Sequence, residues 1–432
     1  MGPETREGFM RRQVVITGIG PVTSAGTGVD KFAEVVFGAK PVPSTHIPGA
    51  FEAGYRFGSK YYIPLPACDL KAHGLDITGE TAMQQEDRMT VLAALLALED
   101  AGYERTASET GYAFKGTADC DLIIGTGITG LESSFLSYLA HNGIGDLALI
   151  GRPPLKIKFN RMIVPQTMTN SPAAWTSIVF GLTGASQTVN ASCASGTVAI
   201  GEAFRRIRDG YSEMVIAGGV ENLHESTGVI MRGFDMLGTL TRSNEGRCYP
   251  FSKRRDGFLY SEGGACVVAV EELTHALKRG ARIYAEIAGY HSNSDAATIV
   301  QMDRSGTRVR KLLGKLAENG TIDYCNAHGT GTELNDGVEA EAIGAMFAKP
   351  PLVNSTKSLI GHTLGASGAI EAAVTALSVY RGMVHGMDVP EPLDNVRIAR
   401  STVEMRIESA ISVSFGFGGH NAGLFMKRFD HE

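Results

Sequence analysis

Short apolar strands that alternate with stretches of helical period predict an α/β fold for this chain. Runs rich in β-branched residues recur along the sequence, at residues 14–17, 122–124, 214–217, 265–270 and 284–287. Between many of these runs, apolar residues follow helical spacing, as they do in residues 89–101 and 195–208. Strands and helices in alternation predict a layered architecture, and we expect its sheets to be mixed.

No linker divides the chain into separate domains. Its 432 residues could hold two or three average domains or one large α/β unit. The alternation of strand and helix before and after about residue 275 permits two similar halves. Residues 41–80 are rich in Pro, Gly, His and Tyr and have little periodicity, so we expect them to cross the surface.

Composition and charge exclude some function classes without naming a partner. The chain is 43% hydrophobic and carries 40 basic and 46 acidic residues, a net charge of -6, as in an ordinary globular protein. It lacks long single-sign runs and therefore has no electrostatic footprint for nucleic acid or for an anionic membrane. Basic clusters that could dock an acidic carrier protein, or simply be solvated, lie at Arg205, Arg206 and Arg208 and at Lys253, Arg254 and Arg255.

Cysteine spacing and the N-terminal residues predict a cytoplasmic location. The six cysteines are scattered without a CxxC pair or metal-ligand spacing, so we expect reduced thiols and no metal site. Residues 1–12 are polar, and no run of about 18 apolar residues occurs. Residues 1–10 are expected to form a disordered tail.

Residues 125–130, GTGITG, match the GxGxxG pattern and follow an apolar run. Taken alone, this match would indicate a dinucleotide-binding oxidoreductase. However, the residues that follow provide no clear acidic partner at the expected offset. The chain has 53 glycines, so a chance match is common, and we rank the oxidoreductase hypothesis last.

Cys193 lies in a pattern typical of a strand, a sharp turn and a helix. Residues 186–196 read SQTVNASCASG and lead into a helical pattern that ends at Gly210. Cys193 thus falls at a helix N-terminus, where free N–H groups and the helix dipole favour a nucleophilic thiolate. A cysteine is more often a small buried hydrophobe. The small residues around Cys193 leave room for a substrate, which favours the catalytic interpretation.

Two histidines lie in turns that precede predicted helices. His328 follows a strand and enters a Gly-Thr turn, and His362 lies at the N-terminal mouth of a later helix. A helix N-terminus disfavours the imidazolium, so His362 would stay neutral and donate an N–H to a developing oxyanion. Asp336 and Glu339 follow His328 near the expected helix start at Asp336, where a capping box and a direct functional role both stay open.

Residues 412–421, SVSFGFGGHN, interleave glycines with two phenylalanines near the C-terminus. This pattern predicts a mobile or strained turn beside an apolar pocket, in which backbone N–H groups could face a carbonyl oxygen. A plain hairpin turn between two core strands is the alternative.

These four segments, in this order and at these distances, together resemble the β-ketoacyl synthase family, particularly its ketoacyl synthase II-like, carrier-dependent members. The resemblance runs from residues 11–20, through the Cys193 segment and residues 255–258, to the Phe-Gly-Phe-Gly-Gly turn. It implies a thiolase-like fold with a five-layered αβαβα core made of two similar halves. Residues 11–275 would carry the nucleophile, and residues 276–432 would carry both histidines and a catalytic lysine.

The resemblance also implies a role for individual residues. Cys193 would be acylated, while His328 and His362 would bind a malonyl thioester and stabilise the enolate formed as carbon dioxide leaves. Lys357 would orient this network, and the backbone N–H groups of Cys193 and Phe417 would form the oxyanion hole. Other matching positions are Glu262, Asp336, Glu339, Thr330 and Thr332 as supporting residues, and Ile128, Phe234, Phe415 and Phe417 along the acyl pocket or its gate.

The family's chemistry needs no metal and no redox cofactor, because its substrates are carried on the phosphopantetheine of an acyl carrier protein. The resemblance implies a homodimer, or a heterodimer with a homologous ketosynthase or chain-length-factor subunit. Three features depart from the family pattern: His420 replaces a frequent Thr, residues 292–309 are short and lack a Pro-Gly stretch, and residues 248–252 match loosely. These departures favour a type II polyketide, polyene or other specialised pathway over housekeeping fatty-acid elongation.

Two further family-level alternatives are weaker. A chain-length factor would shape a tunnel without condensing anything, but such partners typically lack the cysteine that is present here as Cys193. A thiolase or priming synthase would be expected to carry a catalytic Asn, whereas this chain carries His328 and His362.

Overall fold

In the computed structural model, the described residues 11–52, 54–108 and 111–430 build one mixed sheet of twelve strands. The predicted tail at residues 1–10 lies outside the described residues. Along the sheet the strands are β16 (Arg397–Ile398), β14 (Leu352–Asn354), β13 (Tyr324–Asn326), β18 (Ser409–Gly416), β19 (His420–Lys427), β12 (Ala285–Ser294), β1 (Val14–Thr23), β11 (Gly263–Glu272), β9 (Met214–Asn222), β7 (Asp121–Thr126) and β8 (Ser186–Val189), with β2 (Gly26–Thr27) paired to β1.

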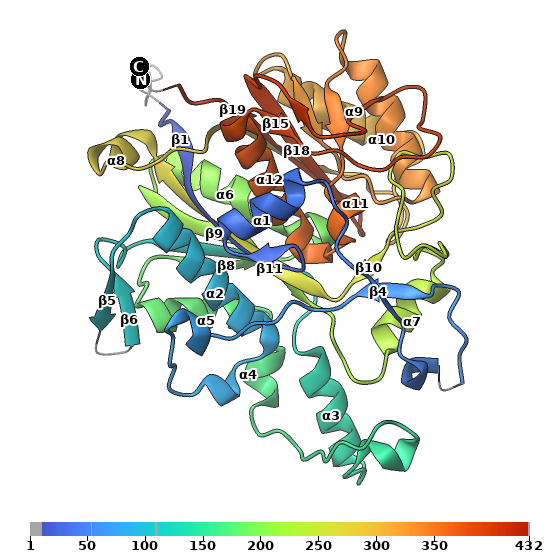
Figure 1. Ribbon diagram of the computed structural model, residues 1–432. Coiled ribbons are helices and arrows are strands. Elements are labelled where there is room, and N and C mark those ends of the chain that lie inside the picture. Colours follow the sequence, from blue (N-terminus) through green and yellow to red (C-terminus); the bar gives the residue numbers. More distant parts are fainter. Residues whose placement is uncertain (1–10, 53, 109–110, 431–432) are drawn as a thin grey trace, which may run out of the picture.

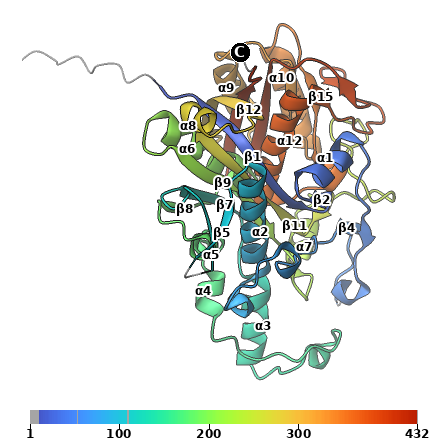
Figure 2. The same ribbon diagram turned by 60° about the vertical axis from the view of Figure 1, so that its left-hand side comes forward.

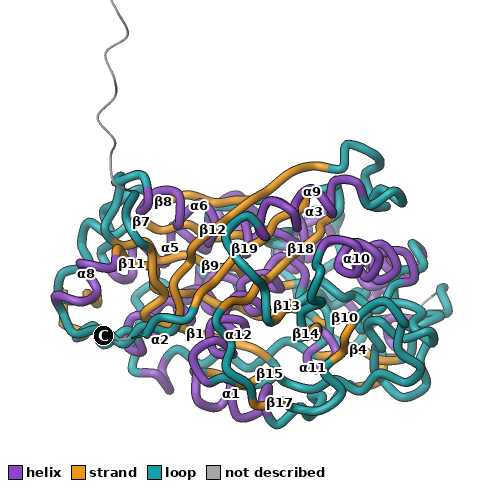
Figure 3. Tube along the Cα trace, turned by 90° about the horizontal axis from the view of Figure 1, so that it is seen from above, coloured by secondary structure: helices purple, strands orange, loops and turns teal. Residues whose placement is uncertain are grey.

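The sheet consists of two halves with the same strand order and the same pairing directions. In one half β8 and β9 flank β7 in parallel, and β11 and β1 follow antiparallel. In the other half β14 and β18 flank β13 in parallel, and β19 and β12 follow antiparallel (Figure 3). β1 pairs with β12 and joins the halves. The predicted α/β fold with mixed sheets and two similar halves is confirmed.

Helices form three layers around the two half-sheets (Figure 1). α6 (Ser195–Arg208) and α12 (Ser367–Arg381) pack together between them. α2 (Gln85–Asp100) and α5 (Ser171–Phe180) cover the half-sheet that contains β1 and β11, and α9 (Thr307–Ala317) and α10 (Glu333–Met346) cover the other. The result is the five-layered thiolase-like arrangement that the sequence implied.

The two central helices meet at their N-terminal ends because both carry a glycine there. A Cβ at Gly196 would lie 2.5 Å from the backbone nitrogen of Ala369, and a Cβ at Gly368 would lie 2.2 Å from Thr197 Oγ1. Neither position has room for a side chain, so the backbones approach closely. This contact brings the chain just before α6 next to the chain just before α12.

Shorter elements surround the layers. They are α1 (Val29–Phe37), α3 (Leu131–His141), α4 (Ile163–Thr167), α7 (Val229–Met236), α8 (Leu273–Lys278), α11 (Lys357–Ile360), β3 (Thr45–His46), β4 (Tyr61–Ile63), β5 (Arg105–Ser108), β6 (Gly111–Phe114), β10 (Tyr260–Ser261), β15 (Met383–Val384) and β17 (Val403–Glu404). α3 and α4 extend from the end of the molecule opposite α9 and α10 (Figure 2). In the described part of the chain no helix is long and apolar enough to cross a membrane.

Residues 41–80 only partly fit the predicted surface segment. They form short strands and 3-10 turns, as the weak periodicity suggested. However, Ile63, Leu70 and Leu75 are buried, and β4 pairs in parallel with β10. The segment therefore contributes to the packed structure beside the active-site motifs.

Candidate active site

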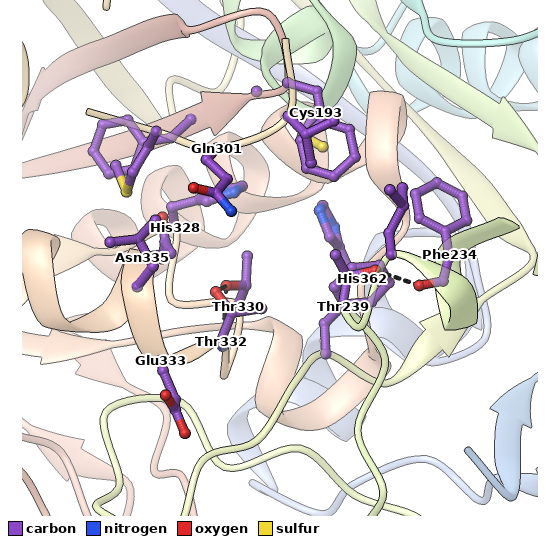
Figure 4. Close-up of a pocket in the computed structure, with 18 of the residues that line it drawn as sticks. Cys193, Phe234, Thr239, Gln301, His328, Thr330, Thr332, Glu333, Asn335 and His362 are labelled. Atoms are coloured by element: carbon purple, nitrogen blue, oxygen red, sulfur yellow. Dashed lines mark hydrogen bonds between the residues drawn. The ribbon is translucent and has the colours of Figure 1, made fainter. Parts of the chain in front are cut away.

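One cavity of about 450 Å³ brings together residues from all four motifs (Figure 4). Cys193, His328, His362 and Phe415 line it, together with Phe417 at the turn between β18 and β19. Its wall combines two kinds of side chain. The aromatic ones include Phe234 and Phe258, and the polar ones include Thr239, Gln301, Thr330, Thr332 and Asn335. One chamber thus contains both histidines together with Cys193, Phe234, Phe415 and Phe417, which come from distant parts of the sequence.

Cys193 lies in a 3-10 turn, η5 (Ser192–Ala194), directly before α6. The backbone N–H of Ala191 donates to Ser195 Oγ at 2.9 Å, and that of Ser192 donates to Asn190 Oδ1 at 3.1 Å, so the turn is held from both sides. Burial raises the pKa of the Cys193 thiol, although a hydrogen bond from Ser192 and the charge of Lys357 act to lower it. The helix-terminal position matches the prediction, whereas the direction of the pKa shift is opposite because burial dominates.

The β18–β19 turn lies against the nucleophile. Gly418 and Gly419 have φ of 81° and 80°, as a tight hairpin requires, so the hairpin interpretation and the pocket interpretation both describe this turn. A Cβ at Gly416 would lie 3.2 Å from the backbone nitrogen of Cys193, and the backbone N–H of Phe417 acts to lower the pKa of the Cys193 thiol. The two backbone groups predicted for an oxyanion hole therefore lie close to the sulfur.

His328 follows β13 and is held from behind by Lys357. Lys357 Nζ lies 3.2 Å from His328 Nδ1, donates to the His328 carbonyl at 2.8 Å and pairs with the buried Glu371. An ammonium group only donates, so Nδ1 must accept and the proton of the neutral ring must be on Nε2. Burial, followed by the charge of Lys357, holds the pKa of His328 well below its usual value.

Asp336 and Glu339 hold the turn that carries His328. Asp336 accepts the N–H of Phe251 at 2.7 Å and that of Gly331, and Glu339 accepts the N–H groups of His328 and Gly329 at 2.7 and 2.8 Å. Burial raises the pKa of Glu339 to about 8. The capping-box alternative is wrong, because α10 begins at Glu333 rather than near Asp336 and both carboxyls bind the preceding turn.

His362 lies between α11 and the 3-10 turn η6 (Leu364–Ala366) that leads into α12. Its Nδ1 accepts the backbone N–H of Leu364 at 3.2 Å and lies 3.0 Å from Ser367 Oγ. Nε2 therefore carries the proton in His362 as well. Burial and the charge of Lys357 hold the pKa of His362 well below its usual value. The two imidazole rings meet edge to face, with centroids 5.5 Å apart.

Lys357, Asp336 and Glu339 support the histidine turns without lining this cavity, and two further predicted site residues do not line it either. Ile128 is 39% exposed and lies outside the residues that line it, so its place in an acyl pocket stays a prediction. Glu262 is buried, but it accepts the N–H of Leu65 at 2.9 Å and lies 2.9 Å from His224 Nδ1. It anchors the 41–80 segment instead of facing the chamber.

The GxGxxG segment has a structural explanation that differs from the dinucleotide-binding hypothesis. A Cβ at Gly125 would lie 2.4 Å from the backbone of Ser195, and one at Gly127 would lie 2.3 Å from Glu221 Oε2. The glycines therefore admit neighbouring protein atoms, where a dinucleotide site would admit a pyrophosphate.

Two buried acids near the site, Glu371 and Glu221, were not predicted from the sequence. Each is 1% exposed. Glu371 pairs with Lys357, and Glu221 accepts the backbone N–H groups of Ile128 and Gly365. The signal was a single acidic residue inside an apolar run, AIEAAV at residues 369–374 and AGGVE at residues 217–221. Such a residue in a buried element is rare unless it has a partner.

The sequence matches two family models, Beta-ketoacyl synthase, N-terminal domain, over residues 11–276 and Beta-ketoacyl synthase, C-terminal domain, over residues 284–387. It is 32% identical to 3-oxoacyl-[acyl-carrier-protein] synthase 2 of Coxiella burnetii, over 97% of this chain and 99% of the relative. It is 30% identical to 3-oxoacyl-[acyl-carrier-protein] synthase 1 of Buchnera aphidicola, over 97% and 100%. A Streptomyces halstedii protein provisionally described as polyketide beta-ketoacyl synthase 1 is 30% identical over 96% and 98%.

Solved structures agree with this assignment. A β-ketoacyl synthase from Burkholderia phymatum superposes with a TM-score of 0.80 at 29% identity, and covers 97% of this chain and all of that chain. The ishigamide ketosynthase/chain length factor superposes with a TM-score of 0.81 at 25% identity and the same coverage. This chain therefore belongs to the β-ketoacyl synthase family of condensing acyltransferases.

Proposed function

We propose that this chain condenses a malonyl thioester, carried on an acyl carrier protein, with an acyl group held as a thioester on Cys193, in a type II polyketide, polyene or other specialised pathway. The observation that carries the proposal is a thiol that shares a cavity with two neutral imidazoles, both fixed in the Nε2–H form. This set supplies one nucleophile, which transfer of the acyl group to the enzyme requires, and two N–H donors, which condensation with the malonyl thioester requires.

In the first half-reaction the Cys193 sulfur attacks the acyl thioester of the carrier. The carbonyl oxygen becomes an oxyanion beside the backbone N–H groups of Cys193 and Phe417. The carbon–sulfur bond to the carrier then breaks, and the thiol proton ends on the departing carrier thiol. Removing one oxyanion donor in such a site typically costs about 3 kcal/mol of transition-state stabilisation.

In the second half-reaction His328 and His362 bind the carbonyl oxygen of the malonyl thioester through their Nε2–H groups. Loss of carbon dioxide leaves an enolate, whose negative charge these two donors stabilise. The enolate carbon attacks the acyl carbonyl on Cys193, and the thiolate that leaves takes up a proton. Neutral imidazoles suit this step because the enolate needs donors more than it needs a strong base. The low pKa of both histidines supports this assignment.

The specialised pathway is supported by the departures from the family pattern and by the polarity of the chamber. Thr239, Gln301 and Asn335 offer hydrogen bonds beside the aromatic wall, which suits a chain that carries oxygen functions. The 3-oxoacyl-[acyl-carrier-protein] synthase of Buchnera aphidicola and the polyketide synthase of Streptomyces halstedii are each 30% identical to this chain, so housekeeping elongation is the second candidate. We also propose an acyl carrier protein as partner and a dimer with itself or with a homologous subunit, as in the ishigamide ketosynthase/chain length factor.

Mass spectrometry of the intact protein after incubation with acyl carriers tests the proposal. Wild type should gain the acyl mass and Cys193→Ala should not, while Cys248→Ala, which removes another buried cysteine, should be acylated normally. Condensation with malonyl carrier is then compared for saturated, unsaturated and oxygenated chains of equal length. A preference for saturated chains would favour housekeeping elongation, and no acylation by any carrier would contradict an autonomous synthase.

A further inference from the structure

Glu221 is a carboxyl group that the mechanism above does not use. It lies near the end of β9, is 1% exposed, and is absent from the residues that line the cavity. Its Oε2 accepts the N–H of Gly365 at 2.8 Å, and its Oε1 accepts the N–H of Ile128 at 2.9 Å. One buried side chain thus connects two backbone segments that belong to different halves of the fold.

The Gly365 contact leads directly to His362. Gly365 follows Leu364, which has a φ of 45° and is therefore in the strained left-handed region. In this conformation the N–H of Leu364 donates to His362 Nδ1 at 3.2 Å, which is the bond that places the ring proton on Nε2. A strained turn needs an external restraint, and the carboxyl of Glu221 binds the adjacent peptide.

The contact with Ile128 is connected to the turn that carries the nucleophile through two further hydrogen bonds. The carbonyl of Gly127 accepts a hydrogen bond from Asn190 Nδ2 at 2.7 Å, and Asn190 Oδ1 accepts the N–H of Ser192 at 3.1 Å. Ser192 has a φ of 54° and directly precedes Cys193. Both catalytic turns therefore contain a left-handed non-glycine residue, and both are connected to Glu221, although the path to Cys193 is longer.

The surrounding backbone is shaped to receive this carboxyl. A Cβ at Gly127 would lie 2.3 Å from Glu221 Oε2, and a Cβ at Gly365 would lie 2.7 Å from the same oxygen. The turns themselves are internally similar, since residues 192–196 read SCASG and residues 364–368 read LGASG. Gly365 thus occupies the position in its turn that Cys193 occupies in the other, and its N–H points at Glu221.

We propose that Glu221 is a positioning residue for the condensation, which holds the Leu364–Gly365 turn so that His362 keeps its Nε2–H form and faces the cavity. The inference rests on the proposed function, because His362 needs that proton to stabilise the enolate. Without the carboxyl, the Gly365 peptide loses its acceptor, the strained turn relaxes, and the Leu364 N–H no longer fixes Nδ1 as an acceptor.

The isosteric variant Glu221→Gln tests this role. A glutamine has one carbonyl oxygen where glutamate has two, so its NH2 group must face the N–H of either Gly365 or Ile128. We expect malonyl decarboxylation to fall about 10-fold to 100-fold, as expected for a misplaced catalytic group. Alkylation of Cys193 by iodoacetamide should not become slower, because the thiol stays in place and loses the charge of Glu221, which acts to raise its pKa.

Nitrogen-15 NMR of the imidazoles, with the His362 signals identified by their loss in His362→Gln, provides a readout independent of turnover. Wild type should show His362 as the pure Nε2–H tautomer, and Glu221→Gln should show a mixture. The matched control is Glu86→Gln, since Glu86 is equally buried and accepts the N–H of Gly130, farther along the same loop, without reaching Gly365. It should retain both the tautomer and the decarboxylation rate.

An unchanged tautomer in both folded Glu221→Gln and folded Gly365→Ala would overturn the inference, and so would an equal loss of decarboxylation and alkylation. If Glu221→Gln does not fold, Gly365→Ala disturbs the same contact from the other side. It should likewise slow malonyl decarboxylation without slowing alkylation of Cys193. A wild type that shows the tautomer but decarboxylates no malonyl carrier would contradict the proposed function while leaving the positioning role supported.

Discussion

At the scale of single residues, Lys357 is an ammonium group that is 1% exposed and contacts His328 directly. Its partner Glu371 is equally buried, so each charge depends on the other. Removing one member of a buried pair leaves an uncompensated charge, whereas replacing both by apolar groups is often neutral. Stability and activity can therefore be separated at this pair.

Lys357→Met should lower the free energy of unfolding by about 3–5 kcal/mol, because Glu371 is left without its partner. The double variant Lys357→Met/Glu371→Leu should recover most of that loss in urea unfolding. Both should remain poor at malonyl decarboxylation, since His328 Nδ1 has lost its donor and the ring no longer has a fixed tautomer. A double variant with wild-type decarboxylation would show that Lys357 serves the fold alone.

At the scale of elements, the reaction geometry depends on how α6 and α12 meet. Cys193 lies in the turn before α6, and His362 lies at the start of the turn before α12, so the separation of the helix N-termini sets the separation of the nucleophile from one donor. Gly196 and Gly368 permit the close approach. The helices act as two rigid supports whose contact defines the site.

Gly196→Ala should therefore cost both stability and condensation. Its Cβ would lie 2.5 Å from the backbone nitrogen of Ala369, and overpacking of this kind costs typically about 1–3 kcal/mol. Gly233→Ala in α7 is the matched control, because its Cβ would meet no atom within 4 Å. It should raise stability by roughly 0.5–1 kcal/mol, as alanine does for glycine inside a helix. Equal thermal stability of the two variants would contradict this account.

At the scale of the whole molecule, buried ionisable groups determine how stability varies with pH. Burial raises the pKa of Asp87 and Glu221 to about 7 and that of Glu339 to about 8. These carboxyls keep a proton in the folded state that they lose in the unfolded state, so they lower stability as pH rises through 7 and 8. His328 and His362 have the opposite sign, but their effect fades between about pH 6.5, where half of the unfolded histidines have lost their protons, and about pH 7.5.

The free energy of unfolding should consequently fall by roughly 2 kcal/mol between about pH 6.5 and pH 8. Urea titrations at the two pH values measure this difference directly. The side chain of Glu339→Gln cannot lose a proton, so this variant should show a smaller fall in the free energy of unfolding. The substitution removes the carboxyl that has the highest pKa of the three. A stability that rises over this interval would mean that Glu339 is already ionised in the folded state.

The sequence predicted the layered fold and most of the site because both depend on local patterns. β-Branched runs gave the strands, and the turns before helices gave Cys193, His328 and His362. Glu221 was missed because its role comes from contacts across 93 and 144 residues of chain. The pKa of Cys193 was predicted in the wrong direction because depth of burial depends on tertiary packing. The start of α10 was predicted too late in the sequence. The spacing of Asp336 and Glu339 is typical of residues that cap a helix, but their carboxyls bind the turn that precedes α10.

The strand order of the sheet also has a consequence for synthesis on the ribosome. β1 is the first strand among the described residues, yet both of its long-range partners, β11 and β12, come more than 200 residues later. At elongation rates of about 5–20 residues per second, β1 waits on the order of 10 to 50 seconds for its first long partner. During this interval the apolar side chains of β1, which are buried in the folded protein, are exposed. The nascent chain is therefore expected to need a chaperone before residue 272 emerges.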